Sequence, residues 1–298
     1  MELESLRTFI AAVRAGSLTA ASRRLHRSQP AITIQIQALE REAQTALLVR
    51  GPRGVRPTPA GELLYARARG LLQEAESLVD DLRSVGALRR GRLRVGATDV
   101  MATGLLPKVL ARFRRRYPGI QVSVSVEGSR GLGAAVVAGD LDLALVTLPL
   151  EHPDLVIGEI HRERIYFVAA PDHHLRGGRL TLAQLAGEPM IHHRAGSVTR
   201  EEVGAVFRLH GFEPRVAMEV SSPEAIKALV ALGLGIAPLS QSQIAGELGE
   251  GRLRRLRVPE FRCWRRSGLI RRRDAVSLRA IEAFGAMMPL RRGRRDKR

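Results

Sequence analysis

Residues 20–34 read AASRRLHRSQPAITI. Apolar residues recur at helical spacing up to Leu25, and a two-residue turn separates them from Ser28, which can cap a second helix. Pro30 is tolerated in the first turn of that second helix because the early amide groups have no helical hydrogen-bond partner. The segment therefore predicts two helices joined by a tight turn.

The second of these helices is predicted to have two different faces. Ile32, Ile36 and Leu39 fall at i, i+4 and i+7, so they should pack inward. The outer face of its N-terminal half carries no charge and presents Gln29, Pro30, Thr33, Ile34 and Gln37. An earlier helix, which Gly16 ends, completes the pattern of a helix-turn-helix DNA reader. A plain three-helix bundle is the alternative on spacing alone.

A β-hairpin is predicted after the third helix. Residues 47–50 and 55–57 flank the turn Gly51-Pro52-Arg53-Gly54, which places Arg53 at the tip. An arginine there could enter a narrow minor groove, where the negative potential is strongest. A solvated turn charge is the alternative. The hairpin would serve as the wing of a winged helix-turn-helix head.

A long helix is predicted over residues 59–87. Its apolar residues alternate by four and three in a sustained heptad seam formed by Leu64, Ala68, Leu71, Ala75, Leu78, Leu82 and Val85. Such a seam favours pairing with a second copy, because a two-fold dimer doubles the DNA contacts. Packing against the chain's own body is the alternative. The candidate dimerisation residues are Leu64, Leu71, Leu78, Leu82 and Val85.

Beyond a hinge at residues 88–91 the pattern changes to alternating strands and helices. The predicted strands include residues 93–96, 120–126 and 141–146, and the alternation restarts at residues 165–169. Strands separated by helices predict parallel sheets with right-handed crossovers. Two such lobes would form a cleft at the carboxyl ends of their strands.

The net charge of +18 is large, but its location makes it weak support for DNA binding by the head. Residues 252–298 contain 17 basic and 4 acidic side chains, so most of the excess lies far in sequence from the predicted head. We interpret residues 291–298 as a solvated basic tail. A non-specific grip on phosphates is the alternative.

Composition and missing motifs exclude several classes of protein. With Cys263 as the only cysteine, no intrachain disulfide, thiolate metal cluster or disulfide-based peroxide sensor can form. HExxH, nucleophile-elbow and phosphate-loop motifs are absent, and the pairs His173-His174 and His192-His193 lack a spaced third ligand. We therefore expect no enzyme, no metal and no cofactor. An acidic N-terminus and the lack of an apolar run of about 18 residues predict a cytoplasmic protein with no membrane partner.

These motifs together resemble the LysR-type transcriptional regulators. The similar segments are residues 20–33, 35–36, 39–40 and 54–61 in the head, and residues 91–96, 139–144 and 233–237 in the sensor. The resemblance implies an α+β multidomain fold with a winged helix-turn-helix, a long linker helix and two α/β lobes similar to periplasmic binding proteins.

The implied division of the chain follows from this resemblance. It assigns residues 1–58 to the DNA-binding domain, 59–87 to the dimerisation helix, 88–91 to the hinge, 92–290 to the effector-binding domain and 291–298 to the basic tail. Within the effector-binding domain, lobe I comprises about 92–161 and 267–290, and lobe II about 162–266.

The resemblance also implies which head residues meet DNA. The candidates are Ser28, Gln29, Pro30, Thr33, Ile34, Gln37 and Arg53. Two of them depart from the family pattern, which is often basic or polar at position 34 and often basic at position 37. Ile34 cannot bond a phosphate or a guanine but could contact a thymine methyl, and Gln37 could pair with adenine. We expect an unusual half-site preference.

Small hydroxyl residues stand where predicted strands give way to helices. Each can be explained as an N-cap, but together they aim several helix N-termini at one cleft, which suits an anion. By resemblance, Thr98, Ser129 and the 197–199 loop are the leading effector-binding candidates. The full set of candidates is Thr98, Val100, Ser129, Thr147, His193, Ser197, Thr199 and Ser222.

The sequence therefore predicts a DNA-binding transcription regulator whose promoter binding is modulated by a small, anionic metabolite. The expected partners are double-stranded promoter DNA, the effector, and a second copy in a homodimer that joins into a homotetramer; RNA polymerase is a further candidate. A ligand-independent DNA-binding protein, a solute-binding protein and an enzyme on the two-lobed scaffold are the alternatives.

Overall fold

The computed structural model describes residues 1–51, 54–83, 91–175, 178–274 and 279–289. The contacts divide the chain into two units, one comprising residues 1–91 and 138–140 and the other 92–137 and 141–298. Within the described residues, no helix combines the length and the apolar character needed to cross a bilayer.

The first unit is a helical head followed by a long helix. Its elements are α1 (Leu3–Ala15), α2 (Leu18–Arg24), α3 (Gln29–Ala43), β1 (Leu48–Gly51), β2 (Gly54–Pro57) and α4 (Pro59–Arg83). Gly16 ends α1 with a left-handed φ of 60°, and the hydroxyl of Ser17 caps α2 by accepting the Ala20 N–H at 3.3 Å. These local signals explain why the helices begin and end where the sequence predicts.

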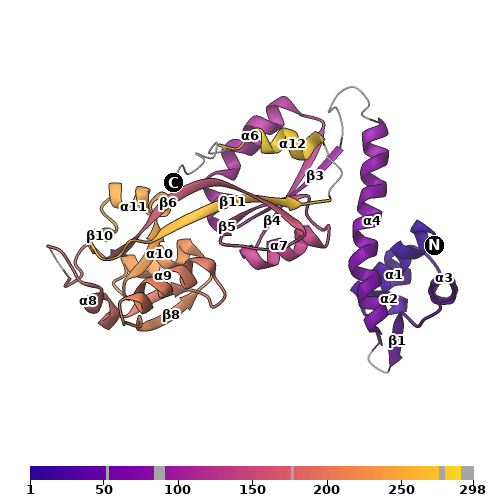
Figure 1. Ribbon diagram of the computed structural model, residues 1–298, viewed down its shortest axis with the longest axis horizontal. Coiled ribbons are helices and arrows are strands. Elements are labelled where there is room, and N and C mark those ends of the chain that lie inside the picture. Colours follow the sequence, from indigo (N-terminus) through magenta and orange to yellow (C-terminus); the bar gives the residue numbers. More distant parts are fainter. Residues whose placement is uncertain (52–53, 84–90, 176–177, 275–278, 290–298) are drawn as a thin grey trace, which may run out of the picture. The chain divides into compact units, whose positions relative to one another are not determined.

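The second unit contains two lobes. The elements of lobe I are β3 (Gly91–Ala97), α5 (Asp99–Thr103), α6 (Leu106–Arg116), β4 (Ile120–Val126), α7 (Ser129–Val137), β5 (Leu143–Leu148) and α12 (Arg279–Gly285). Those of lobe II are α8 (Leu182–Gly187), β7 (Met190–His193), α9 (Val198–Leu209), β8 (Val216–Val220), α10 (Pro223–Ala231), β9 (Ala237–Ser240), α11 (Gln241–Gly249) and β10 (Arg254–Leu256). Two strands, β6 (Leu155–Ala169) and β11 (Trp264–Arg272), extend through both lobes (Figure 1).

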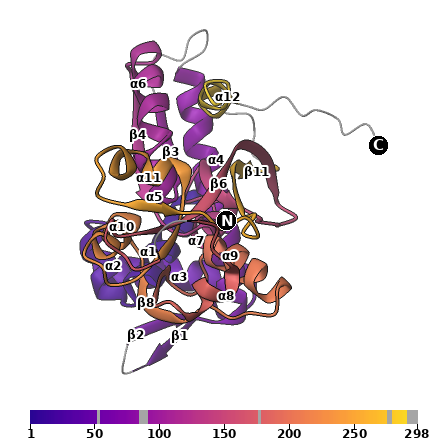
Figure 2. The ribbon, with the colours of Figure 1, turned by 90° about the vertical axis from the view of Figure 1, so that its left-hand side faces the viewer.

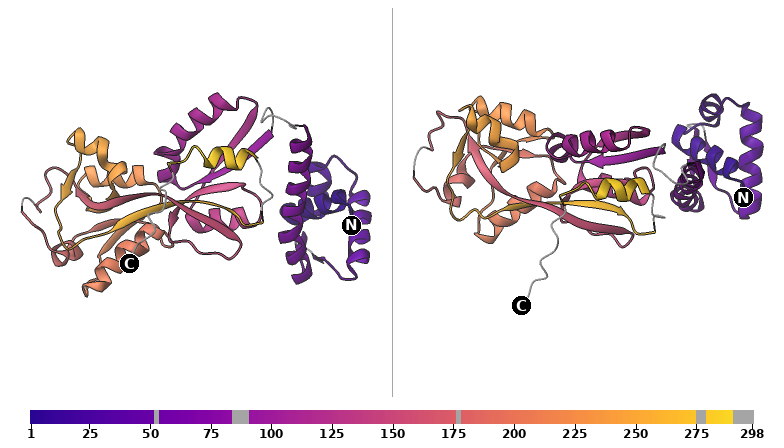
Figure 3. Two further views of the ribbon diagram at one scale, coloured as in Figure 1. Left: turned by 45° about the horizontal axis from the view of Figure 1, so that its top comes forward. Right: turned by 90° about the horizontal axis from the view of Figure 1, so that it is seen from above.

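The strands β6 and β11 carry the chain from one lobe to the other and back. They pair antiparallel along most of β11 and lie side by side in both views of Figure 3. In lobe I, β11 also pairs with β5, and in lobe II the C-terminal part of β6 pairs with β9 and β10. The expected lobe boundaries at 161/162 and 266/267 therefore fall inside these strands, and the strand expected at residues 165–169 begins at Leu155.

The prediction of parallel sheets is only partly right. β3 pairs parallel with β5, β7 pairs parallel with β8, and a parallel bridge joins Met190 to Ile236. β11 is antiparallel to both β5 and β6, and β9 and β10 are antiparallel to β6. The reason is the double crossover: a chain that leaves a lobe along one strand and returns along its neighbour must run in opposite directions on the two.

Aromatic side chains fill the cores of both lobes. In lobe I, Phe284 of α12 packs edge-on against Phe113 of α6 with 5.3 Å between ring centroids, so α12 joins the core of that lobe. In lobe II, Cys263 lies in a core that includes Phe167 and Phe261. Cys263 is buried, as a small apolar core residue would be, and burial raises the pKa of its thiol to about 12.

Candidate DNA-contact surface and effector site

The outer face of α3 is not covered by other parts of the head. The Ser28 hydroxyl caps the helix by accepting the Ala31 N–H at 3.4 Å, and Ile32, Ile36 and Leu39 are buried as predicted. On the opposite face Ile34 is 61% exposed. Gln29, Pro30 and Gln37 are also exposed, and Thr33 is half-buried. The face predicted to meet base edges is therefore not buried in the core of the head.

Two polar contacts fix α3 against its neighbours. Glu40, near the C-terminal end of α3, accepts the backbone N–H groups of Leu47 and Leu48 at 2.9 and 3.1 Å. Thr8 of α1 is buried and donates its hydroxyl to the Gln35 side-chain oxygen at 2.7 Å. Gln35 and Glu40 belong to the sequence motif of the head, and the structure gives both a positioning role.

The wing is anchored at its base by a close backbone approach. β1 and β2 pair antiparallel and form the hairpin that Figure 2 shows. Gly54 has φ 106°, and a Cβ atom there would lie 2.1 Å from the carbonyl oxygen of Gly16, so only glycine fits. The N–H of Val55 donates to that same oxygen at 2.9 Å. The tip residue Arg53, a predicted DNA contact, lies outside the described residues.

A group of buried hydroxyls in lobe I comes from β5, β11, the end of β3 and the start of α7. The Ser129 hydroxyl accepts the backbone N–H of Thr147 at 3.0 Å, and Thr147 is paired with Ser267 across β5 and β11. Thr98 follows the end of β3, and its N–H donates to Leu145 of β5 at 3.0 Å. The hydroxyl oxygens of Thr98 and Ser267 are buried without a hydrogen-bond partner among the described residues.

A buried ion pair lies beside these hydroxyls. Arg265 is two residues before Ser267, so the two side chains share one face of β11. Arg265 is 2% exposed and pairs with Glu163 of β6, and Ser242 donates its N–H to the same carboxylate at 2.8 Å. Burial alone would raise the pKa of Glu163, but Arg265 and Ser242 outweigh it and hold that pKa below its usual value. The Nε of Arg265 remains without a hydrogen-bond partner in the described structure.

Two buried histidines extend the group from lobe II. Burial lowers the pKa of His192 to about 3, and burial together with the charge of Arg265 lowers the pKa of His193 to about 4. Both rings are therefore neutral near pH 7. The His193 N–H donates to Nδ1 of His192 at 2.9 Å, so the neutral His192 ring carries its hydrogen on Nε2. Lobes I and II thus meet in a buried, donor-rich polar cluster.

Comparisons with known proteins agree with this arrangement of domains. A family profile described as "Bacterial regulatory helix-turn-helix protein, lysR family" matches residues 3–62, and one described as "LysR substrate binding domain" matches residues 86–289. The chain belongs to the LysR family of bacterial transcriptional regulators. It is therefore a DNA-binding transcriptional regulator with an effector-binding domain.

Individual LysR-family relatives cover nearly the whole chain. The regulator CbbR of Xanthobacter flavus is 35% identical over 292 residues, covering 95% of this chain and 85% of CbbR. The regulator GltR of Bacillus subtilis (strain 168) is 29% identical over 284 residues, 95% of each chain. Among solved structures, full-length CbnR with its target DNA has a TM-score of 0.69 and 27% identity, covering 97% of this chain and 99% of that one.

The remaining effector-binding candidates of this LysR-family chain differ in their surroundings. Val100 and Thr199 are half-buried in α5 and α9, and Ser197 precedes α9 without capping it through its side chain. Ser222 is exposed and caps α10 by accepting the Ala225 N–H at 3.4 Å. The simple capping explanation therefore accounts for Ser222, while it does not account for the unpartnered hydroxyl of Thr98.

The apolar seam of the linker helix α4 is partly buried in the head and partly exposed. Leu64 packs against the core of its own head and Ala68 is buried there, which matches the alternative interpretation for that part of the seam. Leu71 and Leu78 are 52% and 59% exposed. The side chain of Leu82 and the whole of Val85 lie outside the described residues. Only the part of the seam beyond Ala68 is therefore left for a partner.

An exposed ion pair connects the two lobes. Arg130 of α7 donates to both carboxylate oxygens of Glu201 on α9 at 2.9 Å, and its other terminal nitrogen contacts the Gly196 carbonyl at 3.4 Å. The three residues come from lobe I and lobe II, so this contact depends on the relative position of the lobes. Sequence reasoning did not single out any of them.

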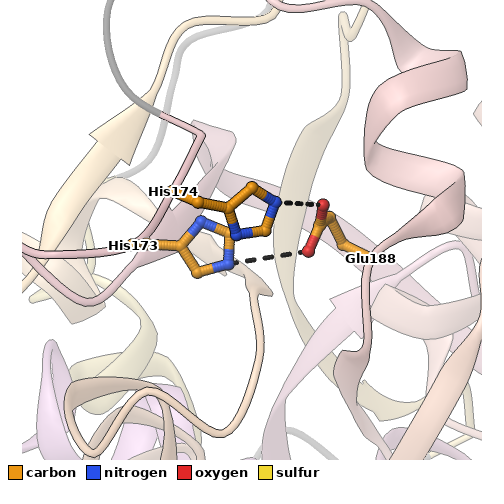
Figure 4. A group of neighbouring side chains, drawn as sticks. All are labelled: His173, His174 and Glu188. Carbon is orange, nitrogen blue, oxygen red and sulfur yellow. Dashed lines mark hydrogen bonds and ion pairs between the residues drawn. The ribbon is translucent and has the colours of Figure 1, made fainter.

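The expectation that the histidine pairs lack a third ligand is wrong for His173 and His174. Glu188 lies against both rings, at 2.9 Å from Nε2 of His174 and 3.7 Å from Nε2 of His173 (Figure 4). Within the described residues, these three form the group whose side chains could hold a metal ion. Burial and the neighbouring His174 lower the pKa of His173, while the carboxylate of Glu188 opposes that shift. Here the three side chains partner one another.

Proposed function

We propose that this LysR-family regulator reads promoter DNA with the outer face of α3 and responds to a small anion held where its two lobes meet. The exposed set on α3 supports the first part: Gln29, Pro30, Ile34 and Gln37 are open while the opposite face is buried. The base contacts would come from this set together with Ser28, Thr33 and the wing residue Arg53.

The anionic character of the effector rests on the polar cluster at the lobe junction. Buried polar groups almost always have hydrogen-bond partners, so buried donors that have none among the described residues point to a ligand. The cluster contains four such atoms: the Thr98 and Ser267 hydroxyl oxygens, Nε of Arg265 and Nε2 of His192. Glu163 neutralises the charge of Arg265, but the guanidinium has five N–H donors and one carboxylate does not use them all. A carboxylate or phosphate would match this excess of donors.

Effector binding would be transmitted through the relative position of the lobes. Ser129, Thr147 and Ser267 belong to strands and helices of lobe I, whereas His193 belongs to lobe II. A ligand touching both sets would favour one interlobe arrangement over another. In a homodimer joined through Leu71 and Leu78 of α4, and in a tetramer of such dimers, that change would alter DNA bending and access of RNA polymerase in the cytoplasm. This role requires no chemical reaction, so we propose no enzymatic activity.

Footprinting on the promoter region beside the protein's own gene tests this function. The wild-type protein should protect a two-fold symmetric site, and Gln29→Ala/Thr33→Ala should lose that protection without a change in thermal stability. Adding citrate, orthophosphate or small dicarboxylates should alter the footprint of the wild type and not that of Ser267→Val. A footprint that no anion changes would support a ligand-independent DNA-binding protein instead.

A further inference from the structure

A pocket lies in lobe II, and it is lined by none of the residues of the polar cluster at the lobe junction. It has a volume of about 410 Å³, within the range of small-molecule sites. Figure 1 shows the edge strand β10, which pairs with β6 in lobe II. Residues of β10 and of the segment after it form much of the pocket wall. Five arginines and one tyrosine line it: Arg164, Arg179, Arg255, Arg257, Arg262 and Tyr166.

Among the described residues, the arginines of this pocket have no acidic partner. None of the five forms an ion pair with a carboxylate there, and no acidic side chain lines the pocket. The neighbouring Glu260 is engaged with the N–H of Leu182 at 3.0 Å. Guanidinium groups stay protonated at any physiological pH, so the repulsion among five of them persists in the free protein. A bound anion would relieve it.

The geometry of the pocket holds two of the guanidinium groups in place. Arg164 and Arg255 both lie over the ring of Tyr166, at 5.5 and 4.6 Å from its centroid. Arg164 also donates to the carbonyl of Phe261 at 3.4 Å, while its buried Nε has no hydrogen-bond partner within the described residues. Stacking reduces the rotamer freedom that such side chains lose on binding, so the pocket is partly preorganised.

We propose that this pocket binds a small molecule that carries two or more phosphate groups. Planar guanidinium forks match phosphate oxygens in pairs, and several phosphates supply enough negative charge to balance five arginines in a small volume. Phe167 and Phe261 give the pocket an apolar floor for the rest of the ligand. A DNA duplex is too wide to enter a cavity of this volume. The site also assigns a role to part of the basic excess in residues 252–298, three of whose arginines line it.

Calorimetric titration of the full-length protein in 150 mM NaCl tests this proposal. The probes are inorganic pyrophosphate, ATP and citrate, which separate a need for linked phosphates, a preference for an attached organic group, and general anion binding. Pyrophosphate or ATP should bind, and Arg255→Ala/Arg262→Ala should weaken that binding at least about tenfold, the cost of losing one charge-assisted contact or more. Arg208→Ala, an exposed arginine of lobe II that does not line the pocket, should change binding less than twofold.

Three outcomes would overturn the proposal. The first is the absence of measurable binding of either phosphate probe at this ionic strength, which would make the pocket a set of solvated arginines. The second is citrate binding as tightly as pyrophosphate in the Ser267→Val background, where the lobe junction no longer binds an anion. The third is unchanged binding in the double variant, provided that thermal unfolding shows it to be folded. Pyrophosphate should still bind the Ser267→Val protein, so this test is independent of the effector site at the lobe junction.

Discussion

Arg265 combines a permanent charge with almost complete burial, which proteins tolerate only when a partner is present. Glu163 supplies the opposite charge, and the Ser242 hydroxyl and N–H satisfy more of the same carboxylate. The pair therefore remains ionised inside the protein. Its importance lies in the cost of breaking it, since removing one partner leaves the other buried and unpaired.

Substitution of Arg265 with methionine should lower the free energy of unfolding by about 3–5 kcal/mol, because Glu163 would then be buried without its counter-charge. Urea denaturation measures this loss. The double variant Arg265→Met/Glu163→Gln should recover a large part of it, since the uncompensated charge is removed. Equal losses in the single and double variants would show that the ion pair is not the cause.

The two buried histidines predict a pH dependence of stability. The pKa values of His192 and His193 are lowered to about 3 and about 4, whereas in the unfolded chain both return to about 6.5. Between about pH 6.5 and pH 4 the unfolded state therefore binds more protons, so stability is complete above pH 6.5 and falls as the pH drops. Each histidine contributes a slope of up to about 1.4 kcal/mol per pH unit.

Chemical denaturation at pH 7.5, 6, 5 and 4.5 checks this slope. His193→Gln should reduce this slope by the amount that corresponds to about one bound proton. His210→Gln, which replaces an exposed histidine, is the matched control. A wild-type stability that rises from pH 6.5 to pH 4.5 would contradict the assignment of these rings as neutral.

At the scale of elements, α3 combines a buried anchor with an open reading face. Ile34 is the residue on that face that most affects sequence preference, because an aliphatic side chain can contact a thymine methyl but cannot bond a guanine. It is 61% exposed, so its replacement should leave stability within about 0.5 kcal/mol.

Binding-site selection should therefore recover thymine at the base pair nearest Ile34. The variant Ile34→Arg should shift that position toward guanine, with a discrimination of about 1–3 kcal/mol for a good bidentate contact. Enrichment of guanine at this position by the wild-type protein would contradict the proposed orientation of α3.

The exposed part of the α4 seam predicts the oligomeric state. Leucine side chains that are more than half exposed on a long helix favour burial against a second helix. Leu71→Glu/Leu78→Glu should convert a dimer into monomers at micromolar concentration in sedimentation velocity experiments. Leu63→Glu is the matched control, because Leu63 is 64% exposed but lies outside the heptad positions. A wild-type monomer would remove the basis for this prediction.

At the scale of the whole effector-binding unit, the lobes are connected by β6 and β11 and by the ion pair between Arg130 and Glu201. The two strands contribute Glu163, Arg265 and Ser267 to the polar cluster at the lobe junction. The ion pair is exposed, with side chains 61% and 47% accessible, so it should contribute at most about 1 kcal/mol. A contact this weak suits an element that has to change during signalling.

Arg130→Ala should thus leave the free energy of unfolding nearly unchanged but alter the effector dissociation constant up to about fivefold, since the contact favours one arrangement of the lobes. Calorimetry with the anion found by footprinting measures the change. Arg252→Ala, which breaks an exposed pair with Glu250 inside lobe II, should leave the dissociation constant as in the wild type. An equal effect of both variants would indicate a general charge effect.

Local signals account for the parts of the molecule that were predicted correctly. Gly16, Ser17 and Ser28 end or cap helices through contacts with residues at most four positions away, so their roles can be inferred from spacing. For Arg265 the available signal was its alternation with Cys263 and Ser267 along a strand, which indicates an inward position but gives no partner. The prediction of parallel sheets missed the antiparallel pairs of β6 and β11, because an alternation of helices and strands does not show where a strand passes from one lobe to the other.

The sequence by itself determined the helical head, its wing, the long linker helix and the family, since each depends on short-range periodicity, capping and turn chemistry. Only the tertiary structure decided that Arg265 meets Glu163, 102 residues away, that β6 and β11 run antiparallel through both lobes, and that five arginines surround one pocket. Side chains that far apart in the chain are brought together by burial of apolar surface, which is non-directional and leaves no local pattern for each pair.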